Sequence, residues 1–382
     1  MRRRLLRLTL VLAILLAAGP RSARPGAGWP LIGPVAAFAG WTLLTALVSG
    51  RPGESLVAAR GLLTFGAFYV VLYALPDARA ARRFAGGLLI AVAMVALLSI
   101  VQVGFCPPGG TLESSHAAVR LLMRKCARAR GFFSIYMTFA GVLTVVLLAA
   151  LPRVALGGRA TVWSLPAWLA GVLALGLTSV RGAWLGFAAG CAGCVLGLRR
   201  RWLVLGALTV VVAGFLVVAP RVLERVKSVG DLADDTTRDR LAMLHAGLGL
   251  VLAHPLTGIG PGQVKHVYPA VAPPEALRRS TSHLHNTPLQ IVVERGLPGL
   301  ATWLAIWVGF FGATWRIWKR VPPADEGARA LVLGSMAAIG AFLVAGLFEY
   351  NFGDTEVLLV ALAVMALPFV VERGLAGAES PG

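Results

Sequence analysis

The stretch from residue 220 to residue 286 separates two strongly apolar parts of this 382-residue chain, and it ends in Ser280-Thr281-Ser282-His283-Leu284-His285-Asn286. Histidines and arginines are concentrated in it, namely His245, His254, His266, His283, His285, Arg238, Arg240, Arg278 and Arg279. An apolar chain that gathers its histidines in one polar loop is expected to have its active site there. A merely solvated loop would also be polar, so the composition alone leaves both interpretations open.

The overall composition predicts a membrane protein. Hydrophobic residues make up 57% of the chain and charged residues only 14%, whereas about a quarter of the residues of a soluble domain are charged. We therefore expect an all-α polytopic membrane protein with about 10–12 transmembrane helices and one long external loop that contains short amphipathic helices.

Ten apolar segments are long enough to be expected as spans, at about 30–48, 56–75, 84–105, 132–151, 162–180, 183–198, 202–219, 289–315, 328–350 and 357–371. An eleventh, at 5–18, is short for a span and also resembles the core of a signal peptide. These segments predict an amino-terminal bundle over 1–219, a loop over 220–288 and carboxy-terminal helices over 289–382. We expect all three to form one integrated membrane domain.

The net charge of +19 is spread over short connections, as the positive-inside rule requires of cytoplasmic loops. The basic residues fall on alternate connections, around Arg82, Arg153, Arg200 and Arg320, which predicts that the loop at 220–286 is external, in a periplasm-like compartment. No nucleic-acid partner is expected, because no basic domain with interleaved aromatic residues is present. Cys106 and Cys126 fall on an external loop, where a disulfide could form, whereas Cys191 and Cys194 should remain reduced inside a helix.

Within the long loop, residues 238–252 show a helical pattern, and its expected apolar stripe against the bundle consists of Leu241, Leu244, Leu248, Val251 and Leu252. Further on, Thr287 can cap a helix that Pro288 opens. This would fix His285 just outside the helix end, at the membrane surface, where an imidazole can exchange protons near neutral pH. A pair of surface histidines is the plainer alternative. A metal site is disfavoured, because no cysteine or clear carboxylate partner lies nearby in sequence.

Four local motifs carry a resemblance to a known family: Thr178-Ser179-Val180-Arg181-Gly182-Ala183; Arg240 with His254-Pro255-Leu256-Thr257-Gly258-Ile259-Gly260; His283-Leu284-His285-Asn286 with Glu294 and Gly296-Leu297-Pro298-Gly299; and Arg130-Gly131-Phe132. With these motifs the chain resembles the O-antigen ligase and O-antigen polymerase superfamily, which includes protein O-oligosaccharyltransferases. It departs from the family pattern where Leu244 replaces a frequent Trp, and where Tyr136 and Met137 replace a His-Pro-Asn-like stretch.

The resemblance implies a metal-independent, inverting transferase without a cofactor, located in the bacterial cytoplasmic membrane. Its donor would be a glycan on undecaprenyl diphosphate, and its acceptor a hydroxyl of a lipid or glycan on the outer face. His285 is the expected base, with His283 in reserve, and Arg181 and Arg240 are expected to bind the diphosphate, since guanidinium groups match phosphate oxygens. Expected substrate contacts are Arg130, Arg238, Arg278, Arg279 and Asn286.

Two other classes of function remain open at this point. A transporter also has many spans, but it should place charges or broken helices at the midplane and contain an internal repeat. A non-catalytic scaffold would not need the cluster of arginines and histidines. Among the remaining carboxylates, Glu294 and Glu349 are expected to pair with Arg295 or with loop arginines, and Asp354 and Glu356 could touch an acceptor.

Overall fold

All regular elements of the described chain are helices. The computed structural model describes residues 28–107, 116, 119, 123, 125–156, 161–197 and 235–378. The elements are α2 (Ile32–Leu47), α3 (Pro52–Ala59), the 3₁₀ helix η1 (Arg60–Phe65), α4 (Gly66–Ala74), α5 (Ala78–Gly104), α7 (Tyr136–Leu156), α8 (Thr161–Leu177), α9 (Arg181–Leu196), α12 (Asp235–Ala253), α13 (Val264–Val271), α14 (Thr287–Arg320), α15 (Glu326–Gly346), the 3₁₀ helix η2 (Asn351–Gly353) and α16 (Thr355–Ala378). The all-helical fold class expected from the sequence is confirmed.

In the described part of the chain, six helical segments are long and apolar enough to cross a membrane: Pro52–Ala74, Ala78–Gly104, Tyr136–Ala155, Thr287–Arg320, Glu326–Gly346 and Thr355–Leu375. Ile32–Leu47 and Val162–Leu177 are shorter apolar helices. Large apolar side chains such as Leu63, Met94 and Val308 are exposed, which suits a bundle surrounded by lipid. The segments expected at 5–18 and 202–219 lie outside the described residues. By its helix composition, the chain is a multi-pass membrane protein.

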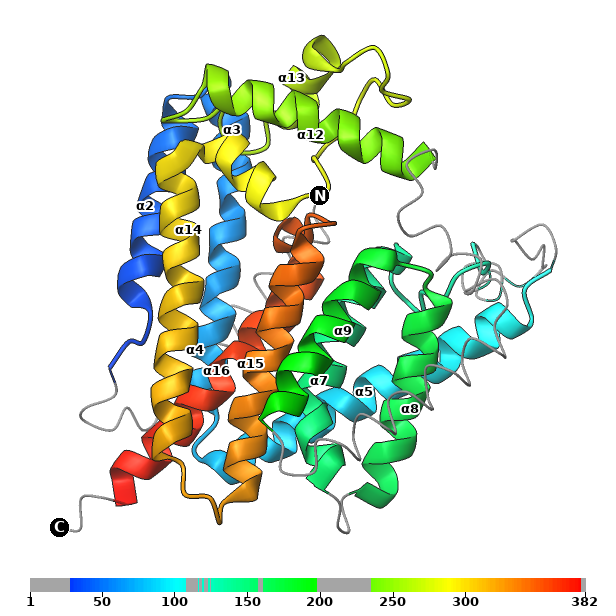
Figure 1. Cartoon of the computed structure of the whole chain (residues 1–382), viewed down its shortest axis with the longest axis vertical. Helices are drawn as coiled ribbons and strands as arrows, with labels where there is room; N and C mark the ends of the chain where they lie inside the picture. Colours follow the sequence, from blue (N-terminus) through cyan, green and yellow to red (C-terminus); the bar gives the residue numbers. More distant parts are fainter. Residues whose placement is uncertain are drawn as a thin grey trace.

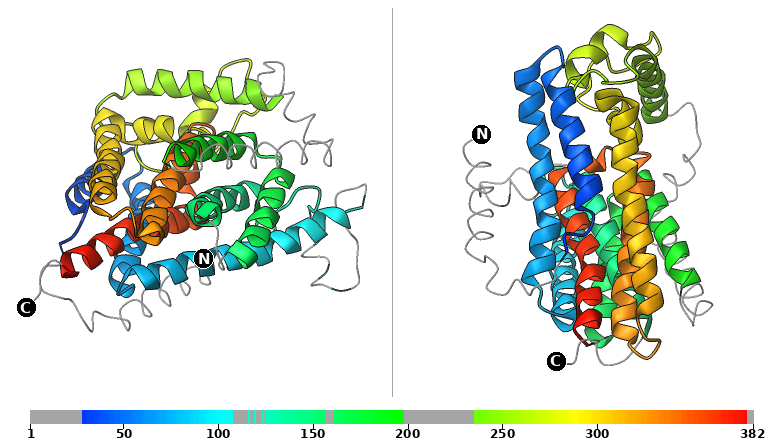
Figure 2. Two further views of the ribbon diagram at one scale, coloured as in Figure 1. Left: turned by 60° about the horizontal axis from the view of Figure 1, so that its bottom comes forward. Right: turned by 90° about the vertical axis from the view of Figure 1, so that its left-hand side faces the viewer.

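The centre of the bundle is formed by α7, α9, α15 and α16, which pack closely on one another. Small residues permit this approach, since a Cβ atom at Gly334 of α15 would stand 2.3 Å from the carbonyl oxygen of Ala149 in α7. The helices α12 and α13 lie across one end of the bundle, at the top of Figure 1, and both views of Figure 2 show the same arrangement. We call this end the loop end.

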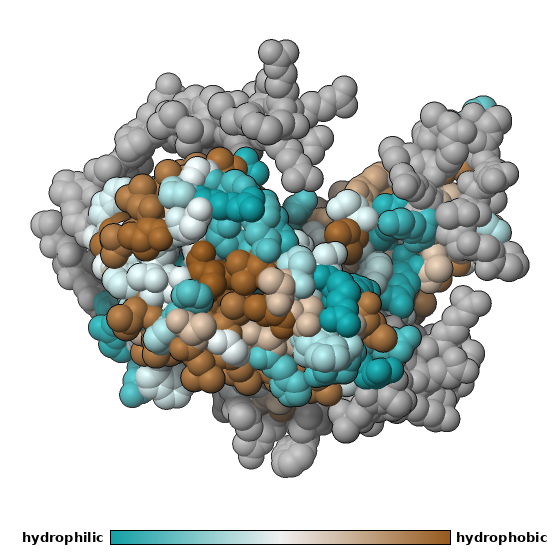
Figure 3. Space-filling view, turned by 90° about the horizontal axis from the view of Figure 1, so that it is seen from above, coloured by the Kyte–Doolittle hydropathy of each residue, from teal (hydrophilic) through white to brown (hydrophobic). Residues whose placement is uncertain are grey.

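The amphipathic helix expected over 238–252 is present as α12, but its expected apolar stripe is wrong. Leu241, Leu244, Leu248 and Leu252 are exposed, while Ala242, Met243, Ala246, Gly247 and Leu250 are buried. The small side chains face the bundle because a Cβ atom at Gly247 would stand only 2.7 Å from the side chain of Leu289 in α14. Figure 3, which views the loop end from above, shows apolar side chains exposed beside polar ones.

The start of α14 differs from expectation in its cap. Asn286, not Thr287, is the N-cap, and its side chain accepts a hydrogen bond from the backbone N–H of Leu289 at 2.9 Å. Asn286 is the N-cap because it has the extended backbone that a cap requires, whereas Thr287 is already part of the helix. The helix is interrupted at Gly296, whose φ of 67° favours glycine. The neighbouring loop closes the gap there, since the N–H of Leu297 donates to the carbonyl of Pro255 at 2.8 Å.

The carboxy-terminal end of α15, at Gly346, comes earlier than the end of the span expected at 328–350. The Asn351 side chain donates to the carbonyl of Phe342 at 2.6 Å, and residues 347–350 form a turn outside the helix. Cys106 and Cys126 form the disulfide that the sequence left open, and Cys191 and Cys194 are free and buried, as expected. The turn after α15 and the segment that follows the disulfide both contribute residues to the cavity described next.

Candidate active site

A cavity of about 250 Å³ opens near the loop end. Its walls come from the segment before α7, the start of α9, the first turns of α12 and the turn after α15. The lining residues are Arg128, Tyr136, Met137, Ser179, Val180, Arg181, Thr236, Asp239, Arg240, Met243, Arg278, His285 and Glu349. Arg181, Arg240 and His285, which lie far apart in the sequence, therefore line the same cavity.

Arg181 reaches the cavity because a tight turn ends α8 and begins α9. Ser179 has a φ of 56°, a strained value for a residue other than glycine, and the hydroxyl of Thr178 donates to the carbonyl of Leu175 at 2.6 Å. Gly182 then lets α9 approach the turn after α15, because a Cβ atom there would stand 2.7 Å from the Cβ of Phe348. This glycine brings Arg181 next to the segment that carries Glu349.

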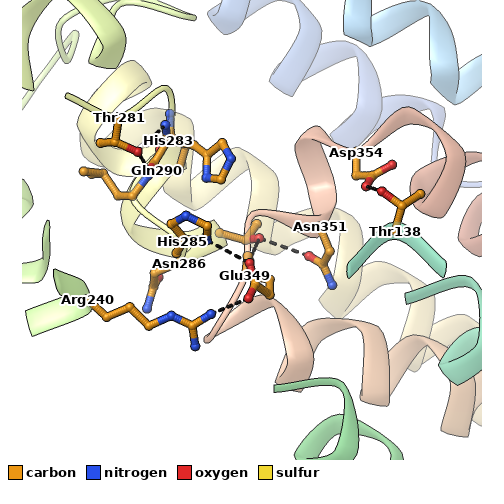
Figure 4. A network of polar contacts seen from close by, with 12 residues as sticks. Thr138, Arg240, Thr281, His283, His285, Asn286, Gln290, Glu349, Asn351 and Asp354 are labelled. Atoms are coloured by element: carbon orange, nitrogen blue, oxygen red, sulfur yellow. Dashed lines mark hydrogen bonds and ion pairs between the residues drawn. The ribbon is translucent and has the colours of Figure 1, made fainter. Parts of the chain in front are cut away.

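Glu349 connects the two other residues of interest, as Figure 4 shows. One carboxylate oxygen accepts a short ion-pair hydrogen bond from the guanidinium of Arg240, and the other lies 2.8 Å from Nδ1 of His285. A carboxylate can only accept, so Nδ1 is the donor of this hydrogen bond, and Nε2 is the ring nitrogen that does not contact Glu349. His285 and Glu349 are each 13% exposed at the side chain. An imidazole that is oriented by a carboxylate in this way can act as a general base.

The backbone around His285 is held firmly. Its φ of 50° is in the left-handed region, and strain of this kind is common at functional sites. On one side, the N–H of Leu284 donates to the side chain of Gln290 at 2.8 Å. On the other, Thr287 Oγ1 donates to the carbonyl of Glu349 at 2.9 Å, and the Asn286 amide donates to the carbonyl of Leu347 at 3.0 Å. The histidine loop and the turn after α15 are thus tied together.

His283 lies behind His285 and is not part of the cavity wall. The two imidazole rings are 4.3 Å apart between centroids, and Nδ1 of His283 is buried without a hydrogen-bond partner. Burial, with a smaller contribution from the neighbouring His285, lowers the pKa of His283 to about 4. The buried ring packs against His285 outside the cavity wall.

The other arginines expected at the site have different positions. Arg278 lines the cavity, and its Nε lies 3.2 Å from the Asp239 carboxylate. Arg279 donates to the backbone carbonyls of residues 272–274 and so fixes a turn. Arg130 donates to the carbonyl of Phe133 at 3.0 Å, while Arg238 is exposed on α12. Arg130, Arg238, Arg279 and Asn286 do not line the cavity.

Several lining residues were missed by sequence reasoning. Arg128 lies with its guanidinium 4.5 Å from the ring centre of Tyr136, and both face the cavity beside Met137. Glu349 was expected only to form an ion pair. A carboxylate at the end of an apolar span was the available signal, since such residues are often functional. Asp354 was a candidate acceptor contact, but its carboxylate accepts from the hydroxyl of Thr138 at 2.5 Å and lies outside the cavity wall.

The electrostatics of the cavity favour an anion. Four guanidinium groups line it, from Arg128, Arg181, Arg240 and Arg278, against the two carboxylates of Asp239 and Glu349. Three helices also begin there, because Tyr136 opens α7, Arg181 opens α9 and Thr236 is the second residue of α12. The positive ends of helix dipoles add to the attraction for negative charge. Within the described chain, no three His, Cys, Asp or Glu side chains are placed to hold a metal ion.

One family of known proteins matches part of this chain. A search of curated proteins finds no match. The family model described as O-Antigen ligase matches residues 165–304, which include Arg181, Arg240 and His285 but not Glu349. With its apolar helices and this match, the chain is a membrane protein with an O-antigen ligase domain.

Proposed function

We propose that this chain transfers a glycan from undecaprenyl diphosphate to an acceptor hydroxyl on the outer face of the bacterial cytoplasmic membrane. The observation that carries the proposal is the convergence of Arg181, Arg240 and His285 on one cavity, with Glu349 bridging the last two. The family match supports the transfer of lipid-linked glycans in general. The donor lipid, the side of the membrane and the roles of single residues are our proposal.

The diphosphate of the donor binds to the arginines. An ionised diphosphate diester carries about two negative charges, and the cavity supplies four guanidinium groups against two carboxylates. Arg240 uses one nitrogen for Glu349, and its remaining N–H groups are available to a phosphate oxygen. Arg181 contributes its guanidinium at the amino terminus of α9, where the helix dipole also favours negative charge.

The acceptor hydroxyl is activated by His285. As the acceptor oxygen forms a bond with the anomeric carbon, its proton moves to Nε2 of His285, while Nδ1–H donates to Glu349. The bond between the anomeric carbon and the diphosphate oxygen breaks, and undecaprenyl diphosphate leaves with the bonding electrons. Guanidinium groups stabilise the charge that develops on this leaving group. Attack opposite the diphosphate inverts the anomeric centre.

Reconstitution of the full chain with a fluorescent glycan on undecaprenyl diphosphate and a panel of lipid and glycan acceptors tests the proposal. We expect His285→Gln to lower the transfer rate about 10²- to 10⁴-fold, and Arg240→Gln to weaken transition-state binding by about 2–4 kcal/mol. The matched control for the histidine is His245→Gln, because His245 is exposed on α12. The matched control for the arginine is Arg316→Gln, because Arg316 is exposed near the end of α14. Transfer at the full rate by His285→Gln would remove the proposal.

A further inference from the structure

A second pocket lies at the opposite end of the bundle, where α7 ends and α5, α8 and α15 begin, at the bottom of Figure 1. It has a volume of about 80 Å³ and is lined mainly by apolar atoms. Its polar lining comes from Arg82 of α5, Arg153 of α7 and Ser164 of α8. None of these residues takes part in the proposed transfer of glycans.

The charges in this pocket are not balanced. The guanidinium of Arg153 donates to the carbonyl of Arg82 at 2.8 Å and lies 5.8 Å from the Trp163 ring centre. Among the described residues, Arg82 has one carboxylate within ion-pair distance, that of Asp325 at 3.7 Å. In the described part of the chain, no carboxylate is within ion-pair distance of Arg153. Two guanidinium groups side by side with one partial counter-charge favour an added anion.

A buried hydroxyl points to the same conclusion. Ser164, a lining residue of the pocket, is 1% exposed, and its Oγ is buried without a hydrogen-bond partner. An unsatisfied buried polar group is unfavourable, and an oxygen of a bound ligand would satisfy it. Glycines keep room beside the guanidinium groups, since a Cβ atom at Gly86 would stand 3.4 Å from Arg153 and one at Gly327 would stand 2.9 Å from Arg82.

The surroundings of the pocket suit a lipid. Exposed apolar side chains continue from it along α5, at Ile90 and Met94, and along α8, at Leu165 and Leu169. Trp163, 39% exposed, occupies the position of an interfacial tryptophan near a helix end. Acyl chains can lie along these two helices while a headgroup phosphate enters between the arginines, as in basic pockets between transmembrane helices.

We propose that this pocket, formed by Arg82, Arg153 and Ser164, binds the phosphate of an anionic phospholipid such as phosphatidylglycerol. The phosphate accepts hydrogen bonds from both guanidinium groups and from Ser164 Oγ. The apolar stripes of α5 and α8 hold the acyl chains. One lipid is bound specifically at each chain, at the end of the bundle away from the candidate active site.

Native mass spectrometry of the full chain in neutral detergent tests this proposal by titration with phosphatidylglycerol. Phosphatidylcholine with the same acyl chains and soluble glycerol phosphate are titrated in parallel. We expect one saturable phosphatidylglycerol, and at least about tenfold weaker binding to Arg153→Gln. Arg83→Gln is the matched control, because Arg83 is exposed next to Arg82 and does not line the pocket. Ser164→Ala keeps both arginines and should weaken binding about fivefold, so it decides the matter if Arg153→Gln does not fold.

Each other outcome counts against the proposal. Equal losses in Arg83→Gln and Arg153→Gln would mean general attraction between a basic surface and an acidic lipid. Equally tight binding of glycerol phosphate would mean a site for soluble phosphate, with no contribution from acyl chains. If neither Ser164→Ala nor Arg153→Gln changes the affinity for phosphatidylglycerol, the lipid binds at another site.

Discussion

Glu294 and Glu349 each pair with an arginine, and the two pairs differ in what surrounds them. The Glu294 carboxylate lies 2.8 Å from Arg295 Nη1 and also accepts from Gln290 and from the N–H of Gly262. Its side chain is 3% exposed and that of Arg295 8%. Both side chains make their hydrogen bonds to other protein groups, including one from Arg295 Nε to Thr42 Oγ1 of α2. The pair therefore stabilises the junction between α2, α14 and the loop before α13.

Glu349 and Arg240 form a pair that faces an open cavity. Their side chains are 13% and 26% exposed, and the second oxygen of Glu349 is engaged by His285. Donor groups of Arg240 remain available on the cavity side. The comparison indicates which carboxylate–arginine pair is a candidate for catalysis. It is the pair whose arginine keeps N–H groups without a protein acceptor among the described residues and whose carboxylate also contacts a histidine. A buried pair whose hydrogen bonds are all made to the protein, such as Glu294 with Arg295, has a structural role.

The largest expected effect separates the two pairs by stability. Arg295→Met leaves the Glu294 carboxylate buried without its cation, which should decrease the free energy of unfolding by about 3–5 kcal/mol. Arg240→Met should have a much smaller effect, because water in the cavity can solvate Glu349. Unfolding in mixed micelles at increasing denaturant concentration measures both. Similar decreases in the free energy of unfolding for Arg295→Met and Arg240→Met would contradict the proposed difference between the two pairs.

The next effect separates the pairs by activity. Glu349→Gln keeps the size of the side chain but removes the negative charge that orients His285, so the transfer rate should fall about 100-fold. The free energy of unfolding should change little, because the side chain borders the cavity. Glu372→Gln is a suitable control, since Glu372 pairs with Arg320 in an exposed ion pair outside the cavity. A rate equal to that of the unmodified chain would make Glu349 another structural acid.

A smaller effect concerns the approach of α9 to the turn that carries Glu349. Gly182→Ala adds a Cβ atom 2.7 Å from the Cβ of Phe348, and this crowding should displace Arg181 and lower the transfer rate about tenfold. Gly193→Ala on the same helix meets no atom within 4 Å and should leave the rate unchanged. If both variants behave alike, the close approach is not what positions Arg181.

A further expected effect is a dependence of stability on pH. His283 has an ordinary pKa of 6.5 in the unfolded chain, but burial lowers the pKa to about 4 in the folded chain. Between these values the unfolded chain binds more protons, so the free energy of unfolding decreases as the pH falls from about 6.5 to about 4. His283→Asn should lose this part of the pH dependence. Unfolding midpoints of the two proteins, measured across this range, should converge at low pH, and parallel curves would contradict the assignment.

The sequence predicted the six long apolar helices of the described chain, because lipid imposes long apolar runs that are read directly from composition. Local motifs singled out Arg181, Arg240 and His285, which line one cavity. It did not reveal the role of Glu349, since the partners of this residue lie 109 and 64 positions away. Hydropathy also extended the span at 328–350 too far, because the side-chain cap from Asn351 that ends α15 early is a tertiary contact.

Two further errors have physical causes. The leucines of α12 show helical periodicity, but periodicity does not say whether an apolar face meets protein, and close packing on α14 selected the face of Gly247. Arg130 was expected near the substrate, whereas Arg128 lines the cavity. These two arginines follow Cys126 in an irregular segment, where no repeating pattern fixes the direction of a side chain.

The coupling between Glu349 and His285 is the most direct test of the account. Transfer rates of the unmodified chain, Glu349→Gln, His285→Gln and the double variant form a double-mutant cycle. If the carboxylate acts only by orienting the imidazole, then Glu349→Gln should change the rate less than about twofold once His285 is already replaced. If the two losses multiply in full, the residues act independently, and a base held in place by Glu349 is contradicted.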